Sequence, residues 1–154
     1  MPHLELDVDT TVPPERIRAA LLDFSERRPD IWPGLERSLY EVIEVGETTA
    51  DIKEGSRMPG MTIWAREHYD WSDPDTVRWT VVESNFCTPG SRVYATLNPA
   101  DGGGTRIHID WERTPTTFGG RIAVFIITAT KGRPLAMSIE KALKRMEADA
   151  PPLA

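Results

Sequence analysis

Cysteine is almost absent from this chain of 154 residues, and histidine is scarce. The single cysteine, Cys87, excludes an intramolecular disulfide and a metal site built from several thiolates. The three histidines, His3, His68 and His108, lack the close spacing of paired metal ligands. We therefore expect no metal, no other cofactor, and a reducing, cytoplasmic environment.

An excess of basic residues and a long hydrophobic run are also missing. The net charge is −6, which argues against nucleic-acid binding because contacts with phosphates need a basic surface. The longest apolar stretch, residues 122–129, is far short of the roughly 20 residues that span a bilayer. The first residues carry neither the basic segment nor the apolar run of a signal peptide. We expect neither a nucleic-acid partner nor stable membrane insertion.

The common catalytic motifs are absent as well. No serine stands in a nucleophile-elbow sequence. The glycine run at 102–104 joins two predicted strands and does not lead into a helix, so a phosphate-binding loop fails on its context. No reaction type is therefore indicated by a local motif, and the predicted fold is the better guide to function.

The order of the predicted elements is the most informative feature that is present. The length indicates one domain, residues 1–150, followed by a disordered tail at 151–154. Residues 4–8 alternate apolar and acidic side chains, which is typical of a half-buried strand. Prolines and an acid at 13–15 then begin a short helix. Residues 30–35 predict a second short helix or an ordered loop.

The middle of the chain has the alternation and the turn residues of a meander of strands. Its first two strands flank a turn at Gly46-Glu47, and its last two flank a loop at 99–104. The predicted strands are 39–45, 48–53, 61–71, 77–83, 92–98 and 105–113.

One long helix is predicted from about residues 116–120 to the C-terminal region. Apolar residues at helical spacing trace a stripe along it. Gly132 and Pro134 predict a kink or a break in this helix. The stripe consists of Ile122, Phe125, Ile126, Ala129, Ala136, Ile139, Leu143 and Met146.

This order of elements resembles the START-related polyketide cyclase and lipid-transport superfamily. Local matches are residues 12–17, 32–34, 69–74 and 103–107. The resemblance covers nearly the whole chain and implies an α+β helix-grip fold. In that fold a curved antiparallel sheet of about seven strands wraps around a long C-terminal helix, with two short helices after the first strand. It also implies a hydrophobic cavity between sheet and helix, but the superfamily shares no universal catalytic residue.

Three charged residues share the parity of the apolar, inward side of the predicted sheet: Glu67, Glu83 and Arg113. A carboxylate that faces an apolar cavity has a raised pKa and is suited to general acid or base chemistry. Glu67 is the best candidate because it lies in mid-strand, with Tyr69 as its partner. Alternatively, Glu83 and Arg113 lie near strand ends and reach solvent. A slip of one residue in strand register would turn Glu67 outward.

Flat aromatic side chains are candidates for the walls of a pocket, although each could equally fill the core. Gly119-Gly120 and Trp32-Pro33-Gly34 are candidates for the mouth of the pocket. The predicted ligand-binding set is Trp32, Ile63, Tyr69, Trp79, Val81, Glu83, Val93, Trp111, Arg113 and Phe125.

The first functional hypothesis is a cofactor-free protein that binds a small hydrophobic or aromatic molecule. The alternative is a cyclase or dehydratase that uses Glu67 and Tyr69 as its acid and base. A third hypothesis is an interaction module whose cavity is filled by its own tryptophans. The sequence leaves the oligomeric state open, a homodimer included.

Overall fold

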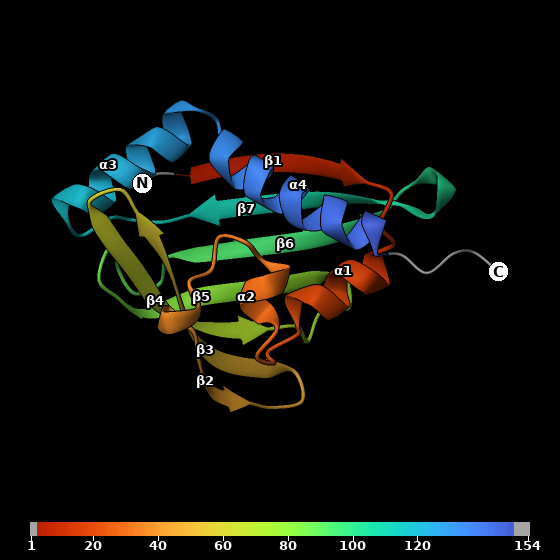
Figure 1. Cartoon of the computed structure of the whole chain (residues 1–154), viewed down its shortest axis with the longest axis horizontal. Helices are drawn as coiled ribbons and strands as arrows, with labels where there is room; N and C mark the ends of the chain where they lie inside the picture. Colours follow the sequence, from red (N-terminus) through yellow and green to blue (C-terminus); the bar gives the residue numbers. More distant parts are fainter. Residues whose placement is uncertain (1–2, 150–154) are drawn as a thin grey trace.

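The computed structural model describes residues 3–149, and the predicted tail at 151–154 lies outside them. Seven strands form one antiparallel sheet in the order β1-β7-β6-β5-β4-β3-β2 (Figure 1). The predicted α+β helix-grip architecture is confirmed. The strands are β1 (His3–Thr10), β2 (Glu41–Val45), β3 (Thr49–Met58), β4 (Met61–Asp70), β5 (Thr76–Ser84), β6 (Arg92–Pro99) and β7 (Thr105–Glu112).

The helices gather on one face of this sheet, where α1 packs against β6 and α4 against β1 (Figure 1). Alternate strand residues on this face join side chains of α1, α3 and α4 in one buried core. The opposite face carries polar pairs such as His68 with Asp51 and His108 with Asp7. The helices are α1 (Pro14–Leu21), α2 (Arg28–Ile31), α3 (Phe118–Ala129) and α4 (Arg133–Ala148), with short 3-10 turns at Arg37–Leu39 and Asp101–Gly103.

The predicted terminal helix is broken, as its glycine and proline indicate. The axes of α3 and α4 are bent by 77°. Gly132 has φ of 76°, a left-handed conformation that glycine adopts without steric cost, and Pro134 lies in the first turn of α4. The break turns α3 away from α4, so α3 forms a separate wall at one end of the sheet (Figure 1).

Two elements end more than two residues away from their predicted boundary. The second helix comes earlier, at Arg28–Ile31, and stops at Trp32 because the residue before Pro33 is disfavoured in helical geometry. Strand β3 runs to Met58, five residues beyond its predicted end at residue 53. The extra length carries Glu54 into the sheet, and this proves important for the site.

A bulge between β4 and β5 explains one error in the predicted inner face. Arg66 pairs with Glu83, but Glu67 pairs with Val81, so Val82 is an extra residue in β5. A bulge shifts the alternation of side chains by one residue. Glu83 is consequently exposed beside Arg66, at 3.4 Å between its Oε2 and Arg66 Nη1, and the prediction that it faces inward is wrong.

Within residues 3–149, no single helix is long and apolar enough to cross a membrane. The bent pair of α3 and α4 meets the length and composition for it only when the two helices are taken together.

Candidate functional site

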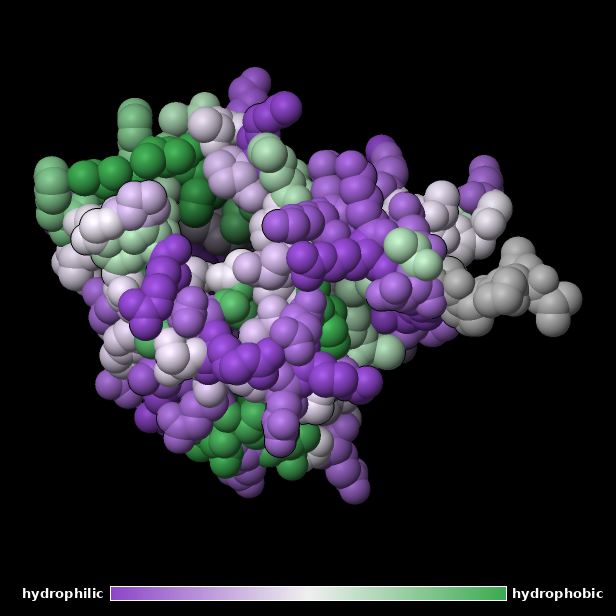
Figure 2. Space-filling view, viewed as in Figure 1, coloured by the Kyte–Doolittle hydropathy of each residue, from purple (hydrophilic) through white to green (hydrophobic). Residues whose placement is uncertain are grey.

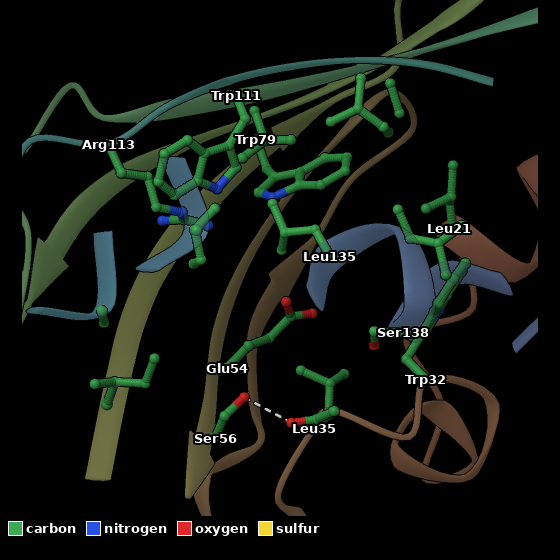
Figure 3. Close-up of a pocket in the computed structure, with 18 of the residues that line it drawn as sticks. Leu21, Trp32, Leu35, Glu54, Ser56, Trp79, Trp111, Arg113, Leu135 and Ser138 are labelled. Carbon is green, nitrogen blue, oxygen red and sulfur yellow. Dashed lines mark hydrogen bonds between the residues drawn. The ribbon is translucent and has the colours of Figure 1, made fainter. Parts of the chain in front are cut away.

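A pocket of about 330 Å³ lies between the inner face of the sheet and helices α1, α3 and α4 (Figure 3). This volume is at the lower end of the range of about 300–1,000 Å³ that is typical of small-molecule sites. Its walls are mainly aliphatic and aromatic. The apolar residues that line it include Ile17, Leu21, Trp32, Leu35, Ile63, Tyr69, Trp79, Val93, Ala95, Ile107, Ile109, Trp111, Ala123, Val124, Ile127, Leu135 and Ile139.

Aromatic rings form a rigid part of this wall. Tyr69 and Trp79 stack with their ring centroids 5.4 Å apart and an interplanar angle of 17°. Trp32 is held in place because its Nε1 donates a hydrogen bond to the carbonyl oxygen of Ala20, at 3.2 Å. Trp79 and Trp111 come from different strands and lie beside each other against the pocket (Figure 3). Such walls offer flat apolar surfaces to a planar ligand.

A buried cluster of Arg28, Glu54 and Tyr69 supplies polar groups at the pocket. Arg28 Nε donates to Glu54 Oε1 at 2.6 Å, and the Tyr69 hydroxyl donates to Glu54 Oε2 at 2.8 Å. Arg28 Nη2 also donates to the Tyr69 hydroxyl oxygen, and Nη1 donates to the carbonyl oxygen of Leu21. Each charged group is therefore hydrogen-bonded, as burial requires.

Burial and pairing shift the ionisation of this cluster. Burial lowers the pKa of Arg28, but the Glu54 carboxylate and the Tyr69 side chain together outweigh burial, so the pKa of Arg28 is raised. Burial raises the pKa of Tyr69 well above its usual range, and the Glu54 carboxylate adds to the effect. Arg28 thus remains a cation, and Tyr69 a neutral hydroxyl that donates to Glu54.

A second ion pair joins Glu67 on β4 to Arg113, just beyond β7. Arg113 Nη2 donates to Glu67 Oε1 at 3.0 Å, and Nη1 lies 3.9 Å from Cys87 Sγ. Burial raises the pKa of Glu67, and the Arg113 guanidinium offsets only part of this rise. Burial lowers the pKa of Arg113, but Glu67 and Cys87 together outweigh burial, so the pKa of Arg113 is raised. Arg113 lines the pocket, whereas Glu67 is buried behind it and does not.

The structure brings most of the predicted binding residues together at the pocket. Three predicted residues do not line it: Val81, Glu83 and Phe125. Val81 is buried on the inner face but belongs to a satellite cluster with Ala65, Phe86 and Cys87. The seven that do line it are Trp32, Ile63, Tyr69, Trp79, Val93, Trp111 and Arg113.

Phe125 is the clearest error in the predicted set, because it is 69% exposed. The prediction assumed that one apolar stripe runs inward along the whole terminal helix. In the broken helix, α3 instead presents Ala123, Val124 and Ile127 to the pocket. Its larger apolar residues lie on the opposite side.

Sequence reasoning missed Glu54 and Arg28. Glu54 shares its parity with Ala50 and Ile52, both buried, so the alternation could have placed it on the inner face had the strand been extended beyond residue 53. Arg28 lies in a one-turn helix with no periodic pattern, and no comparable signal exists for it.

The two predicted mouth segments have different environments. Gly34 lines the pocket, and a side chain there would contact Ser138 Oγ at 3.4 Å. The Ser56 hydroxyl donates to the Gly34 carbonyl oxygen at 2.6 Å (Figure 3). Gly120 is buried, and a side chain there would meet the carbonyl oxygen of Phe86 at 2.6 Å. Close packing therefore explains Gly120 without a role at the mouth.

On the outer face, His3, Glu5 and Asp110 place ligand-type atoms within 4.8 Å of one another. His3 Nε2 already pairs with Asp110 Oδ1 at 2.9 Å. The group is largely exposed, and this pair accounts for its geometry, so we assign no metal site to it.

Residues 1–151 match the family model described as polyketide cyclase / dehydrase and lipid transport. The chain belongs to this family. No curated protein matches it in sequence. We therefore infer the roles of individual residues in this member of the polyketide cyclase / dehydrase and lipid transport family from its own structure.

Solved structures share the fold of this family member at low sequence identity. A Thermus thermophilus protein has a TM-score of 0.77 and 17% identity, over 97% of this chain and 100% of that chain. The Zhui aromatase/cyclase from a Streptomyces species has a TM-score of 0.72 and 14% identity, over 94% of each chain. A START superfamily protein from Mycobacterium smegmatis has a TM-score of 0.73 and 11% identity, over 94% of this chain and 98% of that chain.

Proposed function

We propose that this protein binds a small hydrophobic or aromatic molecule in the pocket between the sheet and helices α1, α3 and α4. The observation that carries the proposal is the combination of apolar walls with a few convergent polar groups. Glu54 on β3 and Arg113, just beyond the end of β7, point into the same space (Figure 3). Sites of this composition bury most of the surface of a ligand and orient it with a few hydrogen bonds.

The lining indicates how such a ligand would lie. Trp79 and Trp111 offer flat surfaces to its planar or aliphatic body, which gains from leaving water. Glu54 accepts a hydrogen bond from a ligand hydroxyl, and Arg113 donates to a ligand carbonyl or phenolate oxygen. Both charged residues already have protein partners, so they also tolerate a ligand that lacks polar groups.

Space inside the pocket argues against the hypothesis of a vestigial cavity. Trp32, Trp79 and Trp111 line the pocket, but about 330 Å³ remains between them and the helices. An interaction module whose core is filled by its tryptophans would lack this space.

Cyclase or dehydratase activity is the second candidate. It is favoured by the buried carboxyl of Glu67, whose pKa is raised by burial, and by the fold shared with an aromatase/cyclase. However, Glu67 lies behind Arg113 and outside the pocket lining. Because Glu67 is paired with Arg113 and does not line the pocket, binding is the function we favour. If chemistry does occur, Glu67→Gln abolishes turnover and leaves binding largely intact.

The affinity for an anilinonaphthalene sulfonate dye, measured by fluorescence, tests the binding proposal. Ser138 lines the pocket from α4, and a tryptophan there would occupy its volume. Met137 is the matched control, because it is the neighbouring residue on α4, is also exposed, and does not line the pocket. We expect Ser138→Trp to weaken dye binding by at least about tenfold, or about 1.4 kcal/mol, and Met137→Trp to leave it unchanged. Equal dye affinity in both variants would contradict the proposal.

A further inference from the structure

Helix α3 is apolar on two opposite sides. One side lines the pocket through Ala123, Val124 and Ile127. The other side, here named the α3 outer face, consists of Phe118, Ile122, Phe125 and Ile126. These residues are 77%, 46%, 69% and 46% exposed, respectively. Their spacing places them in one stripe, and Figure 2 shows an apolar patch over α3 with a hollow beside it.

The exposure of this face is unusual for a surface helix. Soluble domains scatter single apolar residues over their surface, but a contiguous patch with two phenylalanines marks an interaction site. Within the described residues, other large exposed apolar side chains are Val42, Ile43 and Val45 on β2, Val82 on β5 and Met137 on α4. None of these groups contains an aromatic ring.

The charge around α3 differs from that of the rest of the chain. The whole protein has a net charge of −6, yet the sequence contains no Asp or Glu between Glu112 and Glu140. Over this segment Arg121, Lys131 and Arg133 are exposed. The α3 outer face is thus an apolar stripe on a segment of the chain that carries cations and no acids, in an otherwise acidic protein.

We propose that the α3 outer face docks on an anionic lipid surface. A helix that lies in the bilayer interface inserts an apolar stripe with aromatic residues and places Lys and Arg near the lipid headgroups. Negative lipids attract such cations. A second copy of this chain that docked through the same face is a poorer occupant, because it would bring the cations of the two α3 segments together without acids from either segment.

Docking would place the pocket directly beside the lipid. The inner side of the same helix forms part of the pocket wall. The turn between β3 and β4 also reaches α3, where Met61 lies against Gly119 (Figure 1). This surface does not depend on which molecule the pocket binds, and its residues are distinct from the pocket lining.

Co-sedimentation of the full chain with lipid vesicles tests the proposal. The probes are vesicles of phosphatidylcholine alone and an equimolar mixture of phosphatidylcholine and phosphatidylglycerol. We expect binding to the mixed vesicles, weaker binding to phosphatidylcholine alone, and loss of binding at high salt. Phe118→Ser/Phe125→Ser should abolish sedimentation, whereas Val42→Ser/Val45→Ser, on the exposed part of β2, should retain it.

A second pair of variants isolates the charge. Arg121→Glu/Arg133→Glu should weaken binding to the mixed vesicles by at least about tenfold. Lys141→Glu/Lys144→Glu, which changes the net charge equally on an exposed part of α4, should have a much smaller effect. Unchanged dye binding in all variants shows that the pocket is intact, so failure here is distinct from failure of the proposed function.

Three results would overturn the docking proposal. The first is no sedimentation of the wild-type protein with the mixed vesicles. The second is equal sedimentation of the Phe118→Ser/Phe125→Ser variant and its β2 control. The third is a wild-type dimer in analytical ultracentrifugation that the two phenylalanine substitutions convert to a monomer, because the α3 outer face would then be an interface between copies.

Discussion

Arg113 is the residue that connects the pocket to the buried interior. Its side chain lines the pocket, and its guanidinium is the partner of the Glu67 carboxylate at 3.0 Å. Removing two charges from water is costly, and such a pair persists only when its members satisfy each other. Arg113 therefore places its guanidinium cation at the pocket wall, where a ligand oxygen can also accept a hydrogen bond from it.

The first residue-scale prediction concerns this pair. Arg113→Leu should lower the free energy of unfolding by about 3–5 kcal/mol at neutral pH, because it leaves a buried carboxylate without its partner. The double variant Arg113→Leu/Glu67→Leu should recover most of this loss, since neither member of the pair is then left as an unpaired buried charge. Urea unfolding of the wild-type, single and double variants measures these differences.

The loss of stability in the single variant Arg113→Leu should depend on pH. A carboxyl group whose pKa is raised in the folded state contributes stability below its unfolded pKa, and this contribution is lost as pH rises through the folded pKa. Glu67 belongs to this class, and without Arg113 its pKa rises further. The deficit of Arg113→Leu should therefore shrink as the pH is lowered. If the difference in unfolding free energy between the wild type and Arg113→Leu did not change with pH, Glu67 would not be the group left unpaired.

At the scale of elements, the break between α3 and α4 decides which side chains reach the pocket. Gly132 adopts φ of 76°, and a side chain at this position would approach the Cδ2 atoms of Leu4 and Leu6 at 2.6 Å. The break thus combines a left-handed turn with close packing on β1. In the bent arrangement Phe125 is 69% exposed, and Ala123, Val124 and Ile127 of α3 line the pocket.

Gly132→Ala should accordingly destabilise the protein more than a left-handed conformation alone requires. Gly60 is a matched control, because its φ is also 76° but nothing lies within 4 Å of its added side chain. We expect Gly60→Ala to cost about 1–2 kcal/mol from backbone strain. Gly132→Ala should cost measurably more, because Leu4 and Leu6 must also move. Thermal unfolding of both variants tests this, and equal losses would refute the packing role.

The sequence predicted elements better than it predicted side-chain directions. Alternation in β4 and β7 correctly placed Tyr69 and Trp111 inward, because both strands are regular there. The bulge at Val82 reversed the direction of Glu83, and no local sequence signal marks a bulge that is set by pairing with a neighbour. Phe125 was misplaced because periodicity identifies an apolar side of a helix but not what covers it. Arg28 was missed because its partners, Glu54 and Tyr69, are brought to it only by the fold.

At the scale of the whole molecule, the fold provides the pocket and the side chains decide its use. Structural neighbours with 11–17% identity share the architecture, and fold alone does not determine function. In this chain the sheet supplies aromatic walls, α4 and α3 supply aliphatic ones, and Arg28, Glu54 and Arg113 supply polar groups. This arrangement favours a ligand with an apolar body and few oxygens.

Native mass spectrometry of the protein purified from its own host tests the central claim most directly. The account predicts that the wild-type protein carries a hydrophobic or aromatic small molecule and that Met137→Trp carries it as well. Ser138→Trp should lose it, because the added indole occupies the pocket. A wild-type protein that is free of ligand and that also fails to bind the dye, or a molecule retained equally by Ser138→Trp, would contradict binding in this pocket.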